Sequence, residues 1–135
     1  MGLDGHHHTL FEMLGTWSFG DYYKSAACKM AVDLLTGPLG LDRDKLFFTY
    51  FGGCDSLGLG PDEEAREAWL EVGVASDRVL PFGAGHNFWR MGARGPCGPC
   101  AEVHYDHSGR GAGEENEIGF LKSSTVTCLH SLGSF

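Results

Sequence analysis

Apolar residues recur three and four positions apart between Asp21 and Leu35, which is the spacing of one face of an α-helix. The positions of this stripe are Ala27, Met30, Ala31, Leu34 and Leu35. Asp21 can cap the start of the helix, and Gly37 with Pro38 ends it. The pattern therefore predicts a helix from Asp21 to Leu35 in which Met30 and Leu34 are buried.

A second helix is predicted from Pro61 to Val72. Proline suits the first position of a helix, and the carboxylates that follow suit the positive end of the helix dipole. The stripe that we expect to be buried is Ala65, Ala68, Trp69 and Val72. The glutamates on the opposite side, which we expect to face solvent, are Glu63, Glu64 and Glu67.

Four segments have the pattern of strands. Leu46–Phe51 is a continuous aromatic and β-branched run, typical of a buried strand. Arg78 to Phe82 is a short strand, and Ala101 to Tyr105 alternates apolar with polar residues. The segment from Thr9 to Leu14 is predicted to be a strand that runs into a turn. Together with the helices, these strands predict an α/β fold in which the two helices pack on an antiparallel sheet.

Residues 109–135 lack periodicity and carry several glutamates and serines, so we expect a mostly disordered tail after a domain that covers residues 1–108. The chain of 135 residues is 42% hydrophobic and 12% aromatic, enough to build one core. Its formal net charge of -8 argues against a free-standing module that grips a phosphate backbone. Its five cysteines are an odd number with no signal peptide before them, so no disulfide framework is expected. No apolar run approaches the ~18 residues that cross a bilayer, so no membrane partner is expected.

Three segments carry a resemblance to a known family. They are His7 to Lys24 (HHTLFEMLGTWSFGDYYK), Thr49 to Gly53 (TYFGG) and Asn87 to Asp106 (NFWRMGARGPCGPCAEVHYD). In this order, they resemble the catalytic domain of the alanyl-tRNA synthetases over residues 6–108. The short spacing between Val79 and Trp89 looks more like the mitochondrial members, which implies a mitochondrial location. The resemblance implies a partial class II aminoacyl-tRNA synthetase sheet, incomplete at both ends, that binds ATP and alanine side by side.

The resemblance also implies the reaction: with ATP and Mg²⁺, alanine is activated as its adenylate and then transferred to tRNA(Ala). Two arginine-bearing segments of the family find no match in these residues, and neither do its tRNA-binding regions. We therefore expect the 135-residue chain to catalyse no alanine-dependent pyrophosphate exchange by itself, and tRNA(Ala) to bind only through regions absent here. Unpaired edges of such a sheet favour self-association.

Five residues are candidates for the substrate site by this resemblance. Phe11 would stack on adenine, His7 would hydrogen-bond near the phosphates, and Glu102 would orient ATP or magnesium. The same residues are open to simpler interpretations, as sheet core, a surface polar group and a solvated strand face respectively. Met13 and Trp89 would wall the small alanine pocket, where bulky apolar side chains exclude larger amino acids. Ordinary core packing is the alternative for both.

Other readings come from different classes of protein. Cys97, Cys100, His104 and His107 have zinc-ligand residue types, but their spacing is short and on a strand the two histidines would point to opposite faces. We therefore expect no zinc in this segment. The Cys97-Cys100 pair also has the form of a redox dithiol, without the helix N-terminus that activates such pairs. A non-catalytic remnant that binds an adenylate or a partner is a further alternative.

Overall fold

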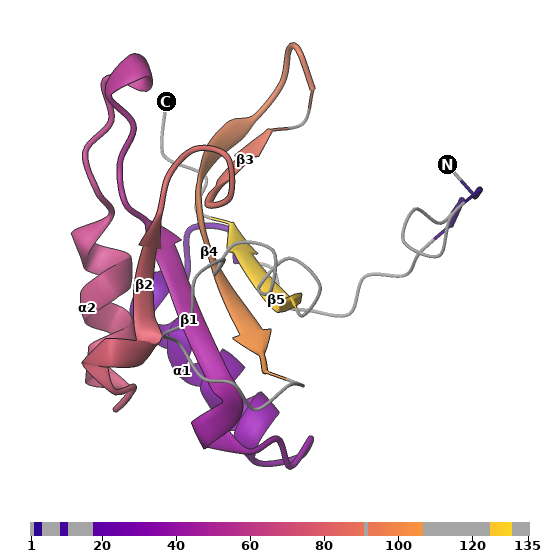
Figure 1. Cartoon of the computed structure of the whole chain (residues 1–135), viewed down its shortest axis with the longest axis vertical. Helices are drawn as coiled ribbons and strands as arrows, with labels where there is room; N and C mark the ends of the chain where they lie inside the picture. Colours follow the sequence, from indigo (N-terminus) through magenta and orange to yellow (C-terminus); the bar gives the residue numbers. More distant parts are fainter. Residues whose placement is uncertain (1, 4–8, 11–17, 91, 107–124, 131–135) are drawn as a thin grey trace.

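The computed structural model describes residues 2–3, 9–10, 18–90, 92–106 and 125–130 (Figure 1). The two helices are α1 (Lys24–Thr36) and α2 (Glu63–Glu71), and short 3-10 turns precede β1, β2 and α2. The strands are β1 (Leu46–Phe51), β2 (Val79–Phe82), β3 (Phe88–Arg90), β4 (Cys97–Tyr105) and β5 (Thr125–His130). None of the helices in these ranges is long and apolar enough to cross a membrane.

The strands form one mixed sheet in the order β2-β1-β4-β3, and β5 also pairs with β4. The pairs β1–β4, β3–β4 and β4–β5 are antiparallel, as predicted, whereas β1 and β2 are parallel. The parallel pair arises because α2 lies in the connection between these two strands, and a crossover of that length returns the chain in the same direction. The predicted mixed α/β class is confirmed.

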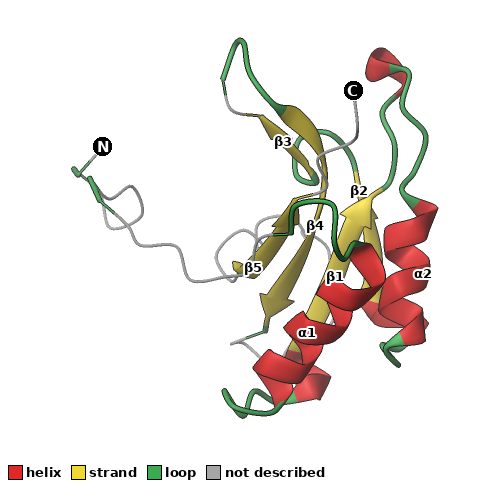
Figure 2. Cartoon of the chain, turned by 180° about the vertical axis from the view of Figure 1, so that it is seen from behind, coloured by secondary structure: helices red, strands yellow, loops and turns green. Residues whose placement is uncertain are grey.

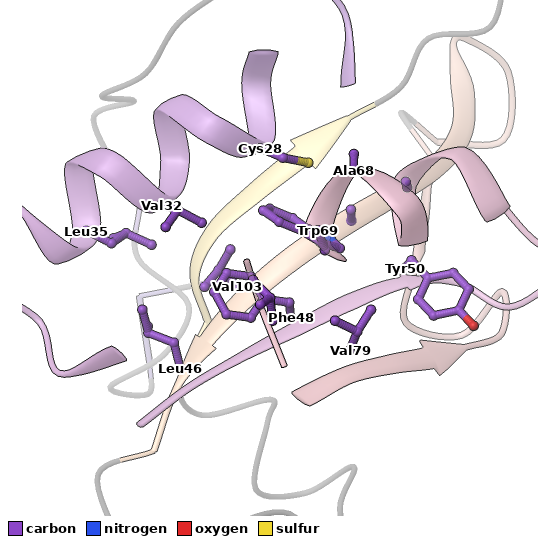
Figure 3. Packing of buried hydrophobic residues seen from close by; sticks show 13 residues of the cluster. Cys28, Val32, Leu35, Leu46, Phe48, Tyr50, Ala68, Trp69, Val79 and Val103 are labelled. Carbon is purple, nitrogen blue, oxygen red and sulfur yellow. The ribbon is translucent and has the colours of Figure 1, made fainter. Parts of the chain in front are cut away.

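Both helices lie against the same face of the sheet (Figure 2). Alternate residues of β1 and β4 point to this face and form the core with the helices. The strand residues of this core are Leu46, Phe48, Tyr50, Val79, Ala101 and Val103. Trp69 of α2 lies among them with no exposed surface, and its ring centroid is 4.9 Å from that of Phe48 (Figure 3). The predicted burial of Trp69 is confirmed, as is the exposure of Glu63, Glu64 and Glu67.

The predicted burial of Met30 and Leu34 is wrong, because these side chains are 38% and 48% exposed. The buried residues of α1 are Cys28, Val32 and Leu35. The helix is thus rotated so that Cys28 completes the buried stripe, which is reasonable because a free cysteine behaves as a small hydrophobic residue. Burial raises the pKa of the Cys28 thiol to about 12, which keeps it neutral in the core.

The helix starts also differ from the predicted ones. The cap position of α1 is Tyr23 rather than Asp21, and it makes no side-chain capping hydrogen bond. Lys24, at the start of α1, instead pairs with Asp62 at 2.7 Å and with Glu64 at 2.8 Å. Asp62 caps α2 by accepting a hydrogen bond from the amide of Ala65. These contacts fix the start of one helix against the start of the other.

Four segments depart from the predicted strands. β4 is longer than expected because it begins at Cys97, and β3 lies in a stretch that was expected to be irregular. Thr125–His130 forms strand β5 against β4, which corrects the expectation of a disordered tail for these residues. The remainder of residues 107–135 lies outside the described residues, so the domain division at 108 stays a prediction. Residues 11–14 lie outside them as well, so the strand expected from Thr9 to Leu14 stays a prediction for these four residues. Thr9 and Leu10 are not in a strand.

Candidate active site

The sheet has a second face, turned away from α1 and α2, which we call the distal face. Residues directly opposite each other in an antiparallel pair share a face. Thr49 lies opposite Glu102, and Phe48 lies opposite Val103 of the core, so Thr49 and Glu102 belong to the distal face. On the same strand β4, Gly98 has the same parity as Glu102 and lies opposite Trp89 of β3. The register therefore brings Trp89 and Glu102 to one face of the sheet.

Trp89 and Glu102 are separated along this face. On β4, the residue opposite Trp89 is Gly98. Gly98 is four residues from Glu102, which corresponds to about 13 Å along a strand. The residue facing Trp89 is a glycine, so no side chain stands directly opposite the indole on β4. Such a separation suits two substrates that lie side by side along one strand.

A hydrogen-bonded cluster lies between these two residues. The amide nitrogen Nδ2 of Asn87 donates to Thr49 Oγ1 and to the carbonyl oxygen of Cys100, each at 2.9 Å. The amide of Glu102 donates to the same Thr49 Oγ1 at 3.2 Å. Asn87 is 1% exposed and Thr49 is fully buried. Polar groups this deeply buried are usually held by such bonds.

Glu102 has a second polar neighbour on its own strand. The imidazole Nε2 of His104 lies 3.2 Å from Glu102 Oε2, and the two side chains are 5% and 21% exposed. The carboxylate of Glu102 is thus half-buried beside a buried histidine. Its 21% exposed surface leaves it open to a metal ion at the face of the sheet.

A family model, described as tRNA synthetases class II (A), matches residues 1–126. The chain belongs to the class II tRNA synthetase family. The resemblance found in the sequence is confirmed, and the chain is a member of an enzyme family of ligases.

The curated relatives of this class II synthetase chain are alanine–tRNA ligases. The chain is 57% identical over 109 residues to the alanine–tRNA ligase of Schizosaccharomyces pombe. It is 56% identical over 107 residues to the mitochondrial form of Drosophila melanogaster, and 50% identical over 109 residues to the cytoplasmic form of the same organism. These matches cover about 80% of the chain, whereas the chain spans 11% of the length of each relative.

The structure tests only part of the predicted site of the synthetase. Trp89 and Glu102 are described, and they share the distal face. His7, Phe11 and Met13 lie outside the described residues, so their roles stay predictions. Asn87 and Thr49, which form the hydrogen-bonded cluster, were not among the predicted residues, although both stand in the segments that carry the resemblance. One feature of the sequence could have indicated Thr49: it is a polar residue inside an apolar run, between Phe48 and Tyr50.

Magnesium, which class II synthetases use with ATP, needs few protein ligands. It is commonly held by one or two carboxylates together with substrate phosphates. Glu102 supplies one carboxylate at the distal face and fits that requirement. Within the described ranges, no group of three His, Cys, Asp or Glu side chains could hold a metal by itself.

The zinc and dithiol alternatives both depend on Cys97 and Cys100. The two cysteines are three residues apart on β4, and one is exposed while the other is buried, so their side chains point to opposite faces. Both belong to a strand rather than to a helix N-terminus. His107, the fourth residue of the zinc pattern, lies outside the described residues. The geometry of the pair thus favours neither alternative.

Proposed function

We propose that this chain forms the part of an alanine–tRNA ligase that binds ATP and alanine for the formation of alanyl adenylate, which is then transferred to tRNA(Ala). The observation that supports the proposal most directly is the common face of Trp89 and Glu102. These two residues come from different strands, and each was expected to contact a different substrate. The shared face lets a single extended ligand, alanine joined to AMP, touch both.

The alanine end of the site is formed by Trp89, with Met13 as a second wall. An indole ring closes a small pocket because it is large and rigid, and one methylene of difference in the substrate changes binding by about 1–3 kcal/mol. Exclusion of larger side chains therefore depends on the position of the ring as much as on its size. Trp89 is the middle residue of β3, and the pairing of β3 with β4 holds its backbone in place.

The nucleotide end of the site is formed by Glu102, Phe11 and His7. Stacking on one aromatic ring contributes about 1–3 kcal/mol, so Phe11 gives weak affinity for adenine. Magnesium, when bound, neutralises charge on the phosphates, and Glu102 is the residue that would hold it. The protein's part in adenylate formation is then to position the alanine carboxylate beside the α-phosphate.

The proposal is tested by the affinity of the 135-residue chain for a stable alanyl-adenylate analogue with a sulfamoyl bridge, measured by titration calorimetry. We expect Trp89→Ala to weaken binding of the analogue at least tenfold and to reduce its preference over the valyl analogue. Binding of ATP should change much less. Leu39→Ala is the control, because Leu39 is 56% exposed in the turn after α1. No binding by the unmodified chain, or an equal loss for ATP and analogue, would refute the proposal.

The partners and the location of the chain are also proposals. We propose that tRNA(Ala) is bound through other regions of a longer ligase, since a charge of -8 does not favour a phosphate backbone. We propose a mitochondrial location because several of the similar ligases are mitochondrial forms. Import of the radiolabelled chain into isolated mitochondria tests this. Self-association through the sheet edge remains a prediction, and sedimentation of the chain at several concentrations tests it.

A further inference from the structure

We infer that Asn87 and Thr49 are positioning residues that set the distance between Trp89 and Glu102, and through it the fit of an alanyl adenylate. The inference rests on the proposed function for its substrate. Its structural part concerns only the position of the Trp89 ring and can be measured without any ligand. Neither residue needs to touch the substrate for this role.

Asn87 connects three segments of the chain. Its backbone amide donates to the carbonyl oxygen of Gly83 at 3.1 Å, and its carbonyl oxygen accepts from the amide of Cys100 at 2.9 Å. Its side chain reaches Thr49 on β1 and Cys100 on β4. Trp89 follows two residues later, so it points to the same side of the strand as Asn87. A shift of Asn87 therefore moves Trp89.

Thr49 connects this cluster to Glu102. Its hydroxyl oxygen accepts from Asn87 Nδ2 and from the Glu102 amide, and it donates to the Glu102 carbonyl oxygen at 3.4 Å. The hydroxyl thus holds the backbone of Glu102 and the side chain of Asn87 at one point. Loss of the hydroxyl would release both ends of the site at once.

The orientation of the Asn87 amide shows which of its atoms matter. The carbonyl oxygen of Cys100 can only accept, so the nitrogen of the amide must face it. The oxygen Oδ1 is buried and has no hydrogen-bond partner among the described residues. The two N–H groups of the Asn87 amide bridge β1 and β4. An aspartate has the same shape but no N–H groups, so it could not form these two hydrogen bonds.

The structural part is tested by fluorine NMR of the chain labelled with 5-fluorotryptophan. The three tryptophans give three resonances, and Trp89→Phe assigns that of Trp89. Thr49→Val removes the hydroxyl and Asn87→Asp removes the N–H groups, each with little change of shape. We expect both to move or broaden the Trp89 resonance, whereas Thr49→Ser, which keeps a hydroxyl, leaves it in place. Thr36→Val is the control, because that hydroxyl bonds within α1 to Val32.

The resonance of Trp69 reports whether each variant is folded, since this residue is fully buried in the core. If Asn87→Asp does not fold because it buries a carboxylate, Asn87→Ser takes its place, since the shorter side chain cannot span to both Thr49 and Cys100. An unmoved Trp89 resonance in a folded variant that lacks either group would overturn the inference. So would a Trp89 resonance displaced by Thr49→Ser.

The functional part is tested with the same variants and the alanyl-adenylate analogue. We expect Thr49→Val and Asn87→Asp to weaken binding of the analogue at least tenfold, with recovery in Thr49→Ser. Asn87→Asp leaves the bonds between Thr49 and Glu102 in place, so it should weaken binding of ATP less than threefold. A moved Trp89 resonance with unchanged affinity for the analogue would overturn the functional part. If the unmodified chain does not bind the analogue, the proposed function fails, while the fluorine resonances still decide the positioning role.

Discussion

The indole nitrogen of Trp69 donates a hydrogen bond of 3.2 Å to the carbonyl oxygen of Thr49. Thr49 therefore contacts the helix side of the sheet through its backbone and the distal face through its side chain. The packing of α2 on the core and the geometry of the candidate site meet at this one residue. Changes in the core near Trp69 are thus expected to reach the site.

Trp69→Phe keeps an aromatic ring against Phe48 but removes the N–H donor. The carbonyl oxygen of Thr49 is then left buried without this partner, which costs about 1–3 kcal/mol. We expect the free energy of unfolding in urea to fall by at least that amount. Glu67→Gln, on the exposed side of the same helix, should change it by less than about 0.5 kcal/mol. A Trp69→Phe variant as stable as the unmodified chain would contradict the role of this hydrogen bond.

The fold was predictable where one local pattern decides it. The run of apolar residues in β1 and the stripe of α2 both follow from spacing along the chain, and Trp69 was placed correctly in this way. The rotation of α1 was not, because it depends on Cys28 filling the space against α2 rather than on the most hydrophobic residues. The pairing of β5 with β4 depends on contacts between distant residues. For the same reason the Asn87–Thr49 bond was missed, since its partners are 38 residues apart.

The ion pairs of Lys24 make stability depend on alkaline pH. Burial lowers the pKa of Lys24, but the hydrogen bonds to Asp62 and Glu64 and the charge of Asp62 outweigh burial and raise it above 10.5. Because the folded-state pKa lies above the unfolded one, this stabilisation is complete below about pH 10 and is lost as pH rises through the folded-state pKa. We expect Lys24→Met to lower the urea midpoint at pH 7 and to have a smaller effect at pH 11.5.

Lys29→Met is the matched control for Lys24. Lys29 pairs with Asp33 within α1, but both side chains are more than 60% exposed. An exposed pair of this kind contributes about 0–1 kcal/mol and usually nothing measurable. The urea midpoints of Lys29→Met should therefore follow those of the unmodified chain at both pH values. Equal effects of Lys24→Met and Lys29→Met would show that the ion pairs of Lys24, although they join α1 to α2, stabilise the fold no more than an exposed pair does.

Two cysteines should differ in their rate of alkylation. Burial raises the pKa of Cys28 to about 12, whereas a hydrogen bond from Ser56 lowers the pKa of Cys54. The thiolate is the reactive form, so at pH 7.5 iodoacetamide should modify Cys54 well before Cys28. Mass spectrometry of peptides at successive times measures this. Ser56→Ala should slow the reaction of Cys54, and rapid modification of Cys28 in the folded chain would show that α1 opens readily.

Gly53 lies where the chain leaves β1 for the loop before α2. Its φ of +99° is in the region that side chains rarely adopt, and a Cβ there would lie 3.3 Å from the Leu59 oxygen and from the Pro61 nitrogen. Gly40 has a φ of +60° with nothing within 4 Å of its Cβ position, so Gly40→Ala isolates the backbone strain alone, about 1–2 kcal/mol. We expect Gly53→Ala to lower the free energy of unfolding by more than Gly40→Ala. The excess measures the close approach of the two backbone segments together with the greater strain at Gly53, because a φ of +99° lies outside the left-handed region that Gly40 occupies. Equal losses would mean that the loop moves away without cost and that the glycine at position 53 is required for its backbone conformation only.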